Sequence, residues 1–428
     1  MTKYFCKIHK YKSGDSMKKN ILLIYIHTFL STFILYYICD TLFYIERGLT
    51  SSQYISFVGI AFFIKLIFEI PFGVVADKYN KKNLLITSNL LFIASTVIFI
   101  FAHNYFTFLI AIIINAINNS LSSGIVNSIL YENTNDKKNF NKILFYNSFS
   151  YNISYMFAMI IGGIIGQKLG LVYAYYFTII PFIIDFVVLL KIKIDKKIEK
   201  NNTEKNISVL KNGIKEIKNN SYLIKLMYKK AVLFSGIKLV EESHPQYSAD
   251  IGISVFLIGM YTSLILIFCI VGSYLGSKSK KDKYSFILNI NPIIVGIFIL
   301  LTGVLNNYIG ILFILLIYIF SESFDNIMVS ELHNNISSKY RVTVESISQF
   351  VFAIFGILFS LTMTILLNFI NLNIMYIILG IMIIILELFS ILKKSNKGFV
   401  KWWNFYLIFN VIFFNISWLF LYFINCKK

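Results

Sequence analysis

Long apolar runs alternate with short polar segments along the whole chain. Many runs are about 20 residues long, which is the length that an α-helix needs to cross roughly 30 Å of hydrocarbon, and they are too long for the strands of a membrane barrel. The pattern therefore predicts an all-α integral membrane protein. The predicted helices cover residues 21–39, 54–75, 84–101, 105–131, 143–165, 171–190, 222–241, 254–275, 284–305, 308–329, 343–368 and 373–392.

The seventh of these helices is weakly apolar, and its start is predicted at either Tyr222 or Ala231. Counting it gives twelve helices and keeps the basic loops on one side of the membrane. A long Lys-rich stretch between Lys191 and Lys230 then separates two halves of six helices each.

These features predict the domain organisation. A polar arm comes first, and Met17 is an alternative to Met1 as the start of translation. The last segment holds a basic link followed by an apolar run that either crosses the membrane as a thirteenth helix, which we favour, or lies in the interface. The predicted segments are the arm 1–16, an N-terminal bundle 17–192, a cytoplasmic linker 193–225, a C-terminal bundle 226–392 and the final segment 393–428.

Composition and charge support a membrane protein and exclude a nucleic-acid binder. Hydrophobic residues make up 57% of the chain and charged residues 14%, whereas a soluble domain has about a quarter charged. The net charge is +19, but the basic residues lie on one predicted face of the membrane. This positive-inside pattern orients the N-terminus to the cytoplasm of a multi-pass protein in a bacterial cell membrane, which cysteine labelling from either side would test. The exceptions among the 40 Lys and Arg are Arg47, Lys65, Lys168, Lys238, Lys427 and Lys428.

The polar segment after the second helix carries a recognisable motif. Gly73 is followed after three residues by Asp77-Lys78, then by Lys81-Lys82 and a leucine. This pattern resembles the signature loop between helices 2 and 3 of the major facilitator superfamily of transporters. Two parallel six-helix bundles are the fold that this resemblance implies.

An internal repeat agrees with two related halves. A shift of 199 positions carries Gly73 to Gly272 and Glu132 to Glu331, each at the predicted cytoplasmic end of the corresponding helix. It also carries Lys142 to Arg341.

Two more segments resemble a drug-efflux-like branch of that superfamily. They are Ser122-Ser123-Gly124 with Leu130-Tyr131-Glu132, and the stretch from Lys339 to Ser346. The antiporter motif expected in the fifth helix is degenerate, since its glycines remain without the proline. The resemblance implies a monomeric secondary transporter that exports small amphipathic or cationic molecules by proton exchange. The alternative is an importer, a lipid or peptide mover, or a non-transporting sensor or immunity protein on the same fold.

Ionisable residues inside apolar runs are the candidates for substrate and proton binding, because a charge within the membrane is costly. Glu322 and Asp325 lie three residues apart on one face of the tenth helix. A carboxyl group in a partly dry cavity could take a proton from one side and release it to the other, and Glu322 is the first choice for this role. The alternative is structural, with either acid paired to Lys238 or to a Ser or Asn on a neighbouring helix.

Polar residues of the first and fourth helices complete the predicted substrate cavity. His27 lies in the first helix and is expected to be a satisfied interior histidine in preference to a proton relay. The fourth helix carries a polar stripe at helical spacing, which is costly if turned to lipid. Its predicted substrate-binding members are Asn115, Asn118, Asn119 and Ser122.

The resemblance also implies a set of gating residues at the cytoplasmic helix ends. Asp77 is expected to interact with the N-terminus of the eleventh helix, just after Arg341, when the halves close on the cytoplasmic side. Its loss should then expose cytoplasmic positions such as Ser128. The predicted gating residues are Gly73, Asp77, Lys81, Lys82, Glu132, Glu331 and Arg341.

Other chemistry is not expected from the sequence. No nucleotide loop and no nucleophile–base arrangement appears, so the chain is not predicted to be an enzyme, and no cofactor is expected. The cysteines lack metal or redox spacing, so neither a metal site nor a disulfide is predicted. Lys65 with Glu69, and Lys238 with Glu241 and Glu242, are expected to neutralise each other locally.

Overall fold

A computed structural model of the chain describes residues 19–132, 140–192, 217, 220–336 and 341–392. Every element with assigned bounds in these ranges is a helix. The predicted N-terminal arm 1–16, most of the linker 193–225 and the final segment 393–428 with its thirteenth helix lie outside the described residues.

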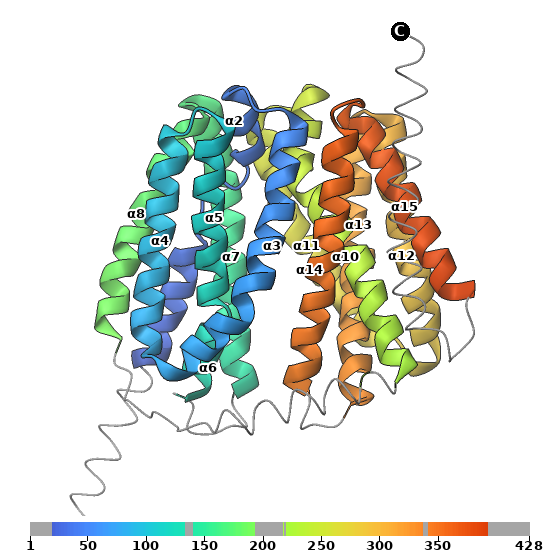
Figure 1. Cartoon of the computed structure of the whole chain (residues 1–428), viewed down its shortest axis with the longest axis horizontal. Helices are drawn as coiled ribbons and strands as arrows, with labels where there is room; N and C mark the ends of the chain where they lie inside the picture. Colours follow the sequence, from blue (N-terminus) through green and yellow to red (C-terminus); the bar gives the residue numbers. More distant parts are fainter. Residues whose placement is uncertain (1–18, 133–139, 193–216, 218–219, 337–340, 393–428) are drawn as a thin grey trace, which may run out of the picture. The chain divides into compact units, whose positions relative to one another are not determined.

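The chain divides into two compact units. The described part of unit 1 contains residues 19–49, 64–132, 140–192 and 252–266. A helix spans residues 19–32, and α4, α5, α7 and α8 run alongside one another (Figure 1). The helices of this unit are α2 (Asp40–Glu46), α4 (Lys81–Phe101), α5 (Tyr105–Ser122), α6 (Ile125–Glu132), α7 (Phe140–Lys168) and α8 (Leu171–Lys191), with the later part of α3 (Ser51–Lys78) and the first part of α11 (Val255–Lys278).

Unit 2 holds the other part of each shared helix, which is residues 51–63 of α3 and the part of α11 after residue 266. The α3 segment joins this unit through α14, because Ser360 on α14 donates a hydrogen bond of 2.6 Å to the carbonyl of Ile55. The remaining helices of unit 2 are α10 (Ser221–Asp250), α12 (Lys281–Leu305), α13 (Tyr308–Asn334), α14 (Arg341–Leu366) and α15 (Leu372–Leu392).

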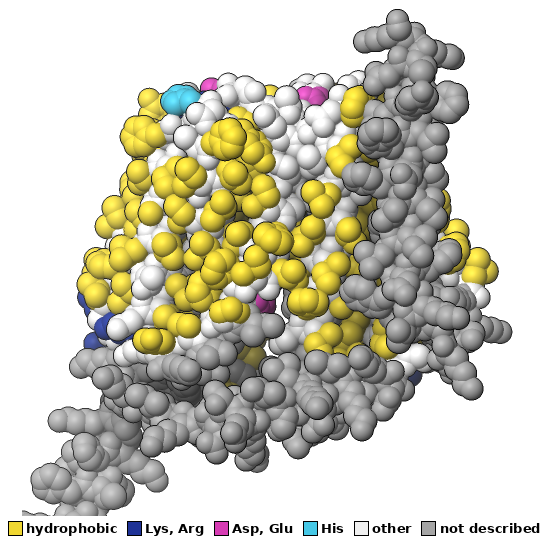
Figure 2. All heavy atoms as spheres, viewed as in Figure 1, with side chains coloured by type: hydrophobic (Ala, Val, Ile, Leu, Met, Phe, Trp, Pro, Cys, Tyr) yellow, Lys and Arg dark blue, Asp and Glu magenta, His cyan; other side chains and the backbone are white. Residues whose placement is uncertain are grey.

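Within the described residues, ten helices are long and apolar enough to cross a membrane. Figure 2 shows hydrophobic side chains spread along the helices of the visible face, whereas Lys and Arg gather near one end. Large side chains such as Phe106 and Ile270 are more than 60% exposed, which suits contact with lipid and not with water. The protein is therefore a multi-pass membrane protein.

Helix α10 is not among those ten, although the sequence predicted a helix here. It runs from Ser221 to Asp250, beyond the predicted end at Glu241. Asn220 caps it by accepting from the backbone N–H groups of Tyr222 and Leu223. Its polar groups, among them Ser235 and His244, are buried, so packing against neighbouring helices compensates for the low hydropathy.

The first predicted helix is interrupted, which corrects the expectation of a continuous helix over 21–39, whereas the fourth remains one candidate span over Tyr105–Tyr131 with a local break. The first ends at residue 32, and its continuation is the short helix α2. The fourth breaks between α5 and α6 at Ser123 and Gly124, where Gly124 adopts φ +73°. Only glycine adopts that backbone conformation readily. Hydropathy does not register a break of this kind, because the residues around it stay apolar.

The break in the first helix is stabilised by other helices of unit 1. The backbone N–H of Leu35 donates to Thr178 Oγ1 on α8 at 3.0 Å, which satisfies a group that lost its helical partner. Gly162 on α7 packs directly against the Leu35 carbonyl, where a Cβ atom would clash. Small residues allow such close backbone contacts between membrane helices.

A second correction concerns the motif between the second and third helices. Helix α3 continues through Asp77 to Lys78, past the predicted end at Val75. Asn80 then begins α4 by accepting a hydrogen bond of 2.9 Å from the backbone N–H of Lys82. The polar link between the two helices is therefore shorter than predicted.

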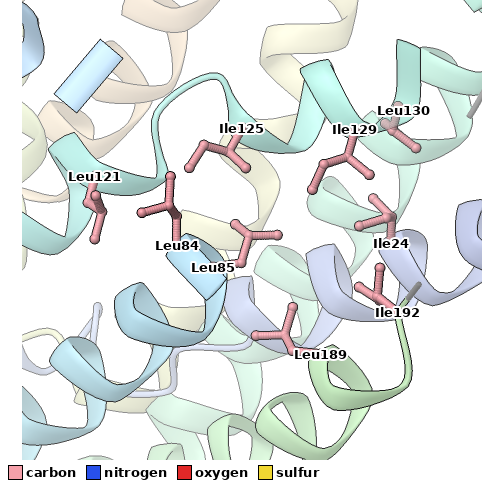
Figure 3. Packing of buried hydrophobic residues seen from close by; sticks show 9 residues of the cluster. All are labelled: Ile24, Leu84, Leu85, Leu121, Ile125, Ile129, Leu130, Leu189 and Ile192. Atoms are coloured by element: carbon pink, nitrogen blue, oxygen red, sulfur yellow. The ribbon is translucent and has the colours of Figure 1, made fainter. Parts of the chain in front are cut away.

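A cluster of buried apolar residues joins the helix of residues 19–32 to α4, α6 and α8 at one end of unit 1. Ile24, Ile129 and Leu189 are fully buried in it. Figure 3 shows Ile24 close to Leu189 and Ile192, with Ile125 and Ile129 from α6 on the other side. The cluster members are Ile24, Leu84, Leu85, Leu121, Ile125, Ile129, Leu130, Leu189 and Ile192.

Candidate functional site

The two predicted acids of the tenth helix lie on α13 in unit 2, and both are partly buried. Asp325 forms an ion pair with Lys230 on α10, with 2.8 Å between Lys230 Nζ and Asp325 Oδ1. Lys230 also lies over the ring of Phe234, with Nζ 5.8 Å from its centroid. Asp325 therefore has a structural partner, which was the alternative considered for these acids, but that partner is Lys230 and not Lys238.

Glu322 is arranged differently from Asp325. No residue in the described ranges forms a hydrogen bond or an ion pair with its carboxyl group, and its electrostatic neighbours include Asp325 and Lys230. Because Lys230 already neutralises Asp325, the group of three carries one surplus negative charge when Glu322 is ionised. This surplus is what a proton or a cationic ligand would neutralise.

Lys238 forms ion pairs with two acids of its own helix. Its Nζ lies 3.2 Å from Glu241 Oε2 and 2.9 Å from Glu242 Oε1. Lys65 lies 3.8 Å from Glu69 on α3. The prediction that both groups neutralise themselves locally is confirmed.

The polar residues predicted to form one stripe on the fourth helix have different surroundings in the structure. Asn118 is buried and accepts a hydrogen bond from Ser88 on α4, so it joins two helices of unit 1. Ser122 donates to the carbonyls of Asn118 and Asn119 within its own helix. Asn119 is exposed, and Asn115 has a buried Oδ1 atom without a hydrogen-bond partner in the described residues. The assignment of Asn115 and Asn119 to substrate binding stays a prediction.

His27 belongs to a buried polar group that the sequence analysis did not assemble. Its Nδ1 lies 2.8 and 3.0 Å from the two carboxylate oxygens of Asp185 on α8. Asn89 on α4 donates to Asp185 Oδ2 at 2.8 Å and to the Phe182 carbonyl at 3.1 Å. The side chain of His27 is 8% exposed and that of Asp185 is 0% exposed. His27 therefore has a hydrogen-bond partner in the interior of unit 1, as expected, and its assignment to substrate or proton binding stays a prediction.

Unit 2 contains a second buried ion pair that the sequence analysis missed. Lys229 Nζ on α10 lies 2.6 Å from Glu387 Oε2 on α15, and the two side chains are 2% and 0% exposed. The signal that reveals such residues is an ionisable side chain inside an apolar run. Asp185 and Glu387 are the single acids of α8 and α15.

The described gating residues make contacts within their own units. Lys81 donates to Ser128 on α6 and Lys82 to the Leu190 carbonyl on α8, each at 2.6 Å. Tyr222 at the start of α10 donates to Glu331 at 2.9 Å. The side chains of Asp77, Glu132 and Arg341, and the surroundings of Gly73, lie outside what the structure describes.

Comparison with known families identifies the class of protein. The family model described as Major Facilitator Superfamily matches residues 21–360, and the chain therefore belongs to this superfamily. Membership makes it a transporter and not an enzyme. No curated protein matches the chain in a sequence search.

Solved structures with the same fold include several transporters. A bacterial homologue of the human lysosomal transporter Spinster, inward-facing and unoccupied, has a TM-score of 0.68 and 13% identity and covers 89% of this chain and 95% of its own. A peptide transporter bound to alafosfalin has a TM-score of 0.67 and 14% identity, with 87% and 93% covered. A D-xylose–proton symporter has a TM-score of 0.67 and 15% identity, with 88% and 96% covered. At these identities the likeness shows the fold alone.

Proposed function

We propose that the protein is a secondary active transporter that exports small amphipathic or cationic molecules across the cell membrane in exchange for protons. It is built as two six-helix bundles, residues 17–192 and 226–392, joined by the cytoplasmic linker 193–225. The N-terminus faces the cytoplasm, and transport proceeds by alternating access. Membership of the superfamily and the internal repeat support this proposal.

The observation that carries the proposal is the unpaired carboxyl group of Glu322, among the described residues, beside the Asp325–Lys230 ion pair. A single partly buried carboxylate binds either a proton or a cation, because binding one removes the charge that attracts the other. Mutually exclusive binding at one group makes export of a cation depend on entry of a proton. The polar side chains of Asn115 and Asn119 are assigned to substrate binding.

The resemblance of Ser122-Ser123-Gly124 and its surroundings to a drug-efflux-like branch supports the direction of transport. Transport by purified protein in liposomes tests the proposal. With a labelled organic cation on the cytoplasmic side and an acidic opposite side, we expect uphill movement that stops when an ionophore collapses the pH gradient. Equal rates with and without the gradient would remove proton exchange from the proposal, and no movement of any cation tested would count against export of cations.

Lys81 and Lys82, at the start of α4, form hydrogen bonds within unit 1. We therefore assign gating, the change between the inward-open and outward-open states, to the other predicted gating residues, which are Gly73, Asp77, Glu132, Glu331 and Arg341. We expect Asp77→Asn to slow transport several-fold, because a surface charge near a helix end contributes on the order of 1 kcal/mol to one state. Asp77→Glu keeps the charge and should be milder. Initial rates of transport in liposomes measure both effects.

The same variant should alter the accessibility of the cytoplasmic end of unit 1. Ser128 is less suitable as a reporter because it accepts a hydrogen bond from Lys81. Its neighbour Asn127 is exposed, so the rate of thiol labelling is measured at Asn127→Cys. If the labelling rates in the parent background and in the Asp77→Asn background are identical, Asp77 has no role in gating, and the motif serves only to orient the helices in the membrane.

A further inference from the structure

The two buried ion pairs occupy equivalent places in the two halves of the chain. Lys229 lies 202 positions after His27, and Glu387 lies 202 positions after Asp185. Asn291, which is buried on α12, likewise follows Asn89 by 202 positions. A buried pair of a cation and an acid is therefore present in each unit, but the asparagines differ, because Asn89 donates to Asp185 while Asn291 donates to the Phe320 carbonyl.

The copies differ in the chemistry of the cation. In unit 2 the partner of the acid is a lysine, and in unit 1 it is a histidine. Histidine is the side chain whose charge ordinarily changes between pH 5 and 8. The copy in unit 1 therefore holds the residue type that pH-dependent sites most often use.

The copies also differ in their backbone. Lys229 lies in α10, which is continuous from Ser221 to Asp250. His27 lies in the helix of residues 19–32, which ends shortly after it at the break before α2. The break removes the helical hydrogen bonds that would couple this short helix to α2, so the helix can shift while the contact of Leu35 with Thr178 stays in place.

We propose that His27 and Asp185 form a proton-binding site in unit 1, and that loss of the proton moves the helix of residues 19–32 away from α8. With the proton bound, the pair is neutral overall and both carboxylate oxygens face His27 Nδ1. Without it, a carboxylate with a net negative charge stays buried next to a neutral imidazole and Asn89. An uncompensated buried charge is strongly unfavourable, and movement of the helix relieves it by admitting water.

Polar groups from α4, α7 and α8 lie on or near the pair. From α4 the group that faces the pair is Asn89, and from α8 it is Asp185 itself. From α7, Asn147 accepts a hydrogen bond from Thr28, and the ring of Tyr146 lies 6.4 Å from that of Tyr25. The buried apolar cluster that includes Ile24 and Leu189 is shown in Figure 3. Along the two helices it lies about one turn from His27 and Asp185, toward the helix ends. This cluster excludes water while the proton is bound.

The test measures the distance between the two helices directly. Leu22 and Leu190 are 58% and 51% exposed, so nitroxide labels at Leu22→Cys and Leu190→Cys, in full-length protein without its native cysteines, report the separation without entering the pair. We expect the distance distribution in lipid nanodiscs to shift to longer values as the pH rises from 5 to 8. His27→Lys copies the pair of unit 2, and we expect this variant to lose the shift.

Unit 2 supplies the matched control. Ile224 and Leu392 lie 202 positions after the first two label sites, and labels there should show no shift over the same pH range, because their pair has no histidine. If His27→Lys does not fold, His27→Gln replaces it, since an amide donates to Asp185 but does not titrate. A constant distance in the parent protein, or the same shift in the parent and in the His27 variant, overturns the proposal. The measurement involves no transport, so either result leaves the proposed function standing.

Discussion

Glu322→Gln is expected to remove the dependence of transport on the pH gradient. The amide keeps the size of the side chain but cannot bind and release a proton, so uphill export should fall to the rate measured without a gradient. Binding of a neutral substrate should remain, because Glu322 has no partner in the described residues whose position its charge maintains. Transport and binding are measured on the same preparation in liposomes.

Two control variants make this result specific to Glu322. Glu241→Gln removes an acid whose side chain is 44% exposed and already paired with Lys238, and its transport should respond to the gradient as the parent protein does. Asp325→Asn frees Lys230 to neutralise Glu322, so we expect both cation binding and the response to the pH gradient to weaken, without the complete loss of response expected for Glu322→Gln. Full gradient-driven transport by Glu322→Gln would show that the coupling proton binds elsewhere.

Lys229→Met is expected to give the largest loss of stability. The substitution leaves Glu387 buried without its cation, and breaking a buried pair by removing one partner costs about 3–5 kcal/mol. We expect this loss in the free energy of unfolding, measured by denaturant titration in detergent micelles, together with a lower midpoint of thermal unfolding.

The double variant Lys229→Met, Glu387→Leu separates the ion pair from simple packing. With both charges replaced by apolar groups of similar volume, stability should return to near or above that of the parent protein. Lys238→Met is the exposed comparison, because its side chain is 36% exposed and surface pairs contribute about 0–1 kcal/mol. A loss of similar size in the Lys229 and Lys238 variants, or no recovery in the double variant, would contradict a stabilising role for the buried pair.

The membrane class and the approximate positions of the helices were predictable from the sequence. An apolar run of sufficient length crosses the bilayer whatever its neighbours are, and basic loops orient it. The motif at Gly73 to Lys82 indicated the superfamily that the family model matches over residues 21–360. The local pairs Lys65–Glu69 and Lys238–Glu242 were also predictable, because residues four apart on a helix always lie on the same side.

The partners of the buried charges were not predictable in this way. His27 meets Asp185 across 158 positions, and Lys229 meets Glu387 across the same number. Asp325 could equally have met Lys230 or Lys238 on the same predicted helix, and only the packing of α10 on α13 selects Lys230. The different surroundings of the polar residues on the fourth helix were not predictable either. Ser88 on α4 donates a hydrogen bond to Asn118, while Asn119 stays exposed.

The sequence by itself determined that this chain is a helical membrane protein of this superfamily, because hydropathy, loop charge and the motif are properties of neighbouring residues. Tertiary structure decided which carboxyl groups keep a partner and where helices break. The break after residue 32 depends on Thr178, which lies 143 positions from the Leu35 amide that it satisfies, and the unpaired state of Glu322 among the described residues depends on Lys230 being held by Asp325. The first is a consequence of the low dielectric within the membrane, where a backbone group that loses its helical partner must find another and a distant helix supplies it.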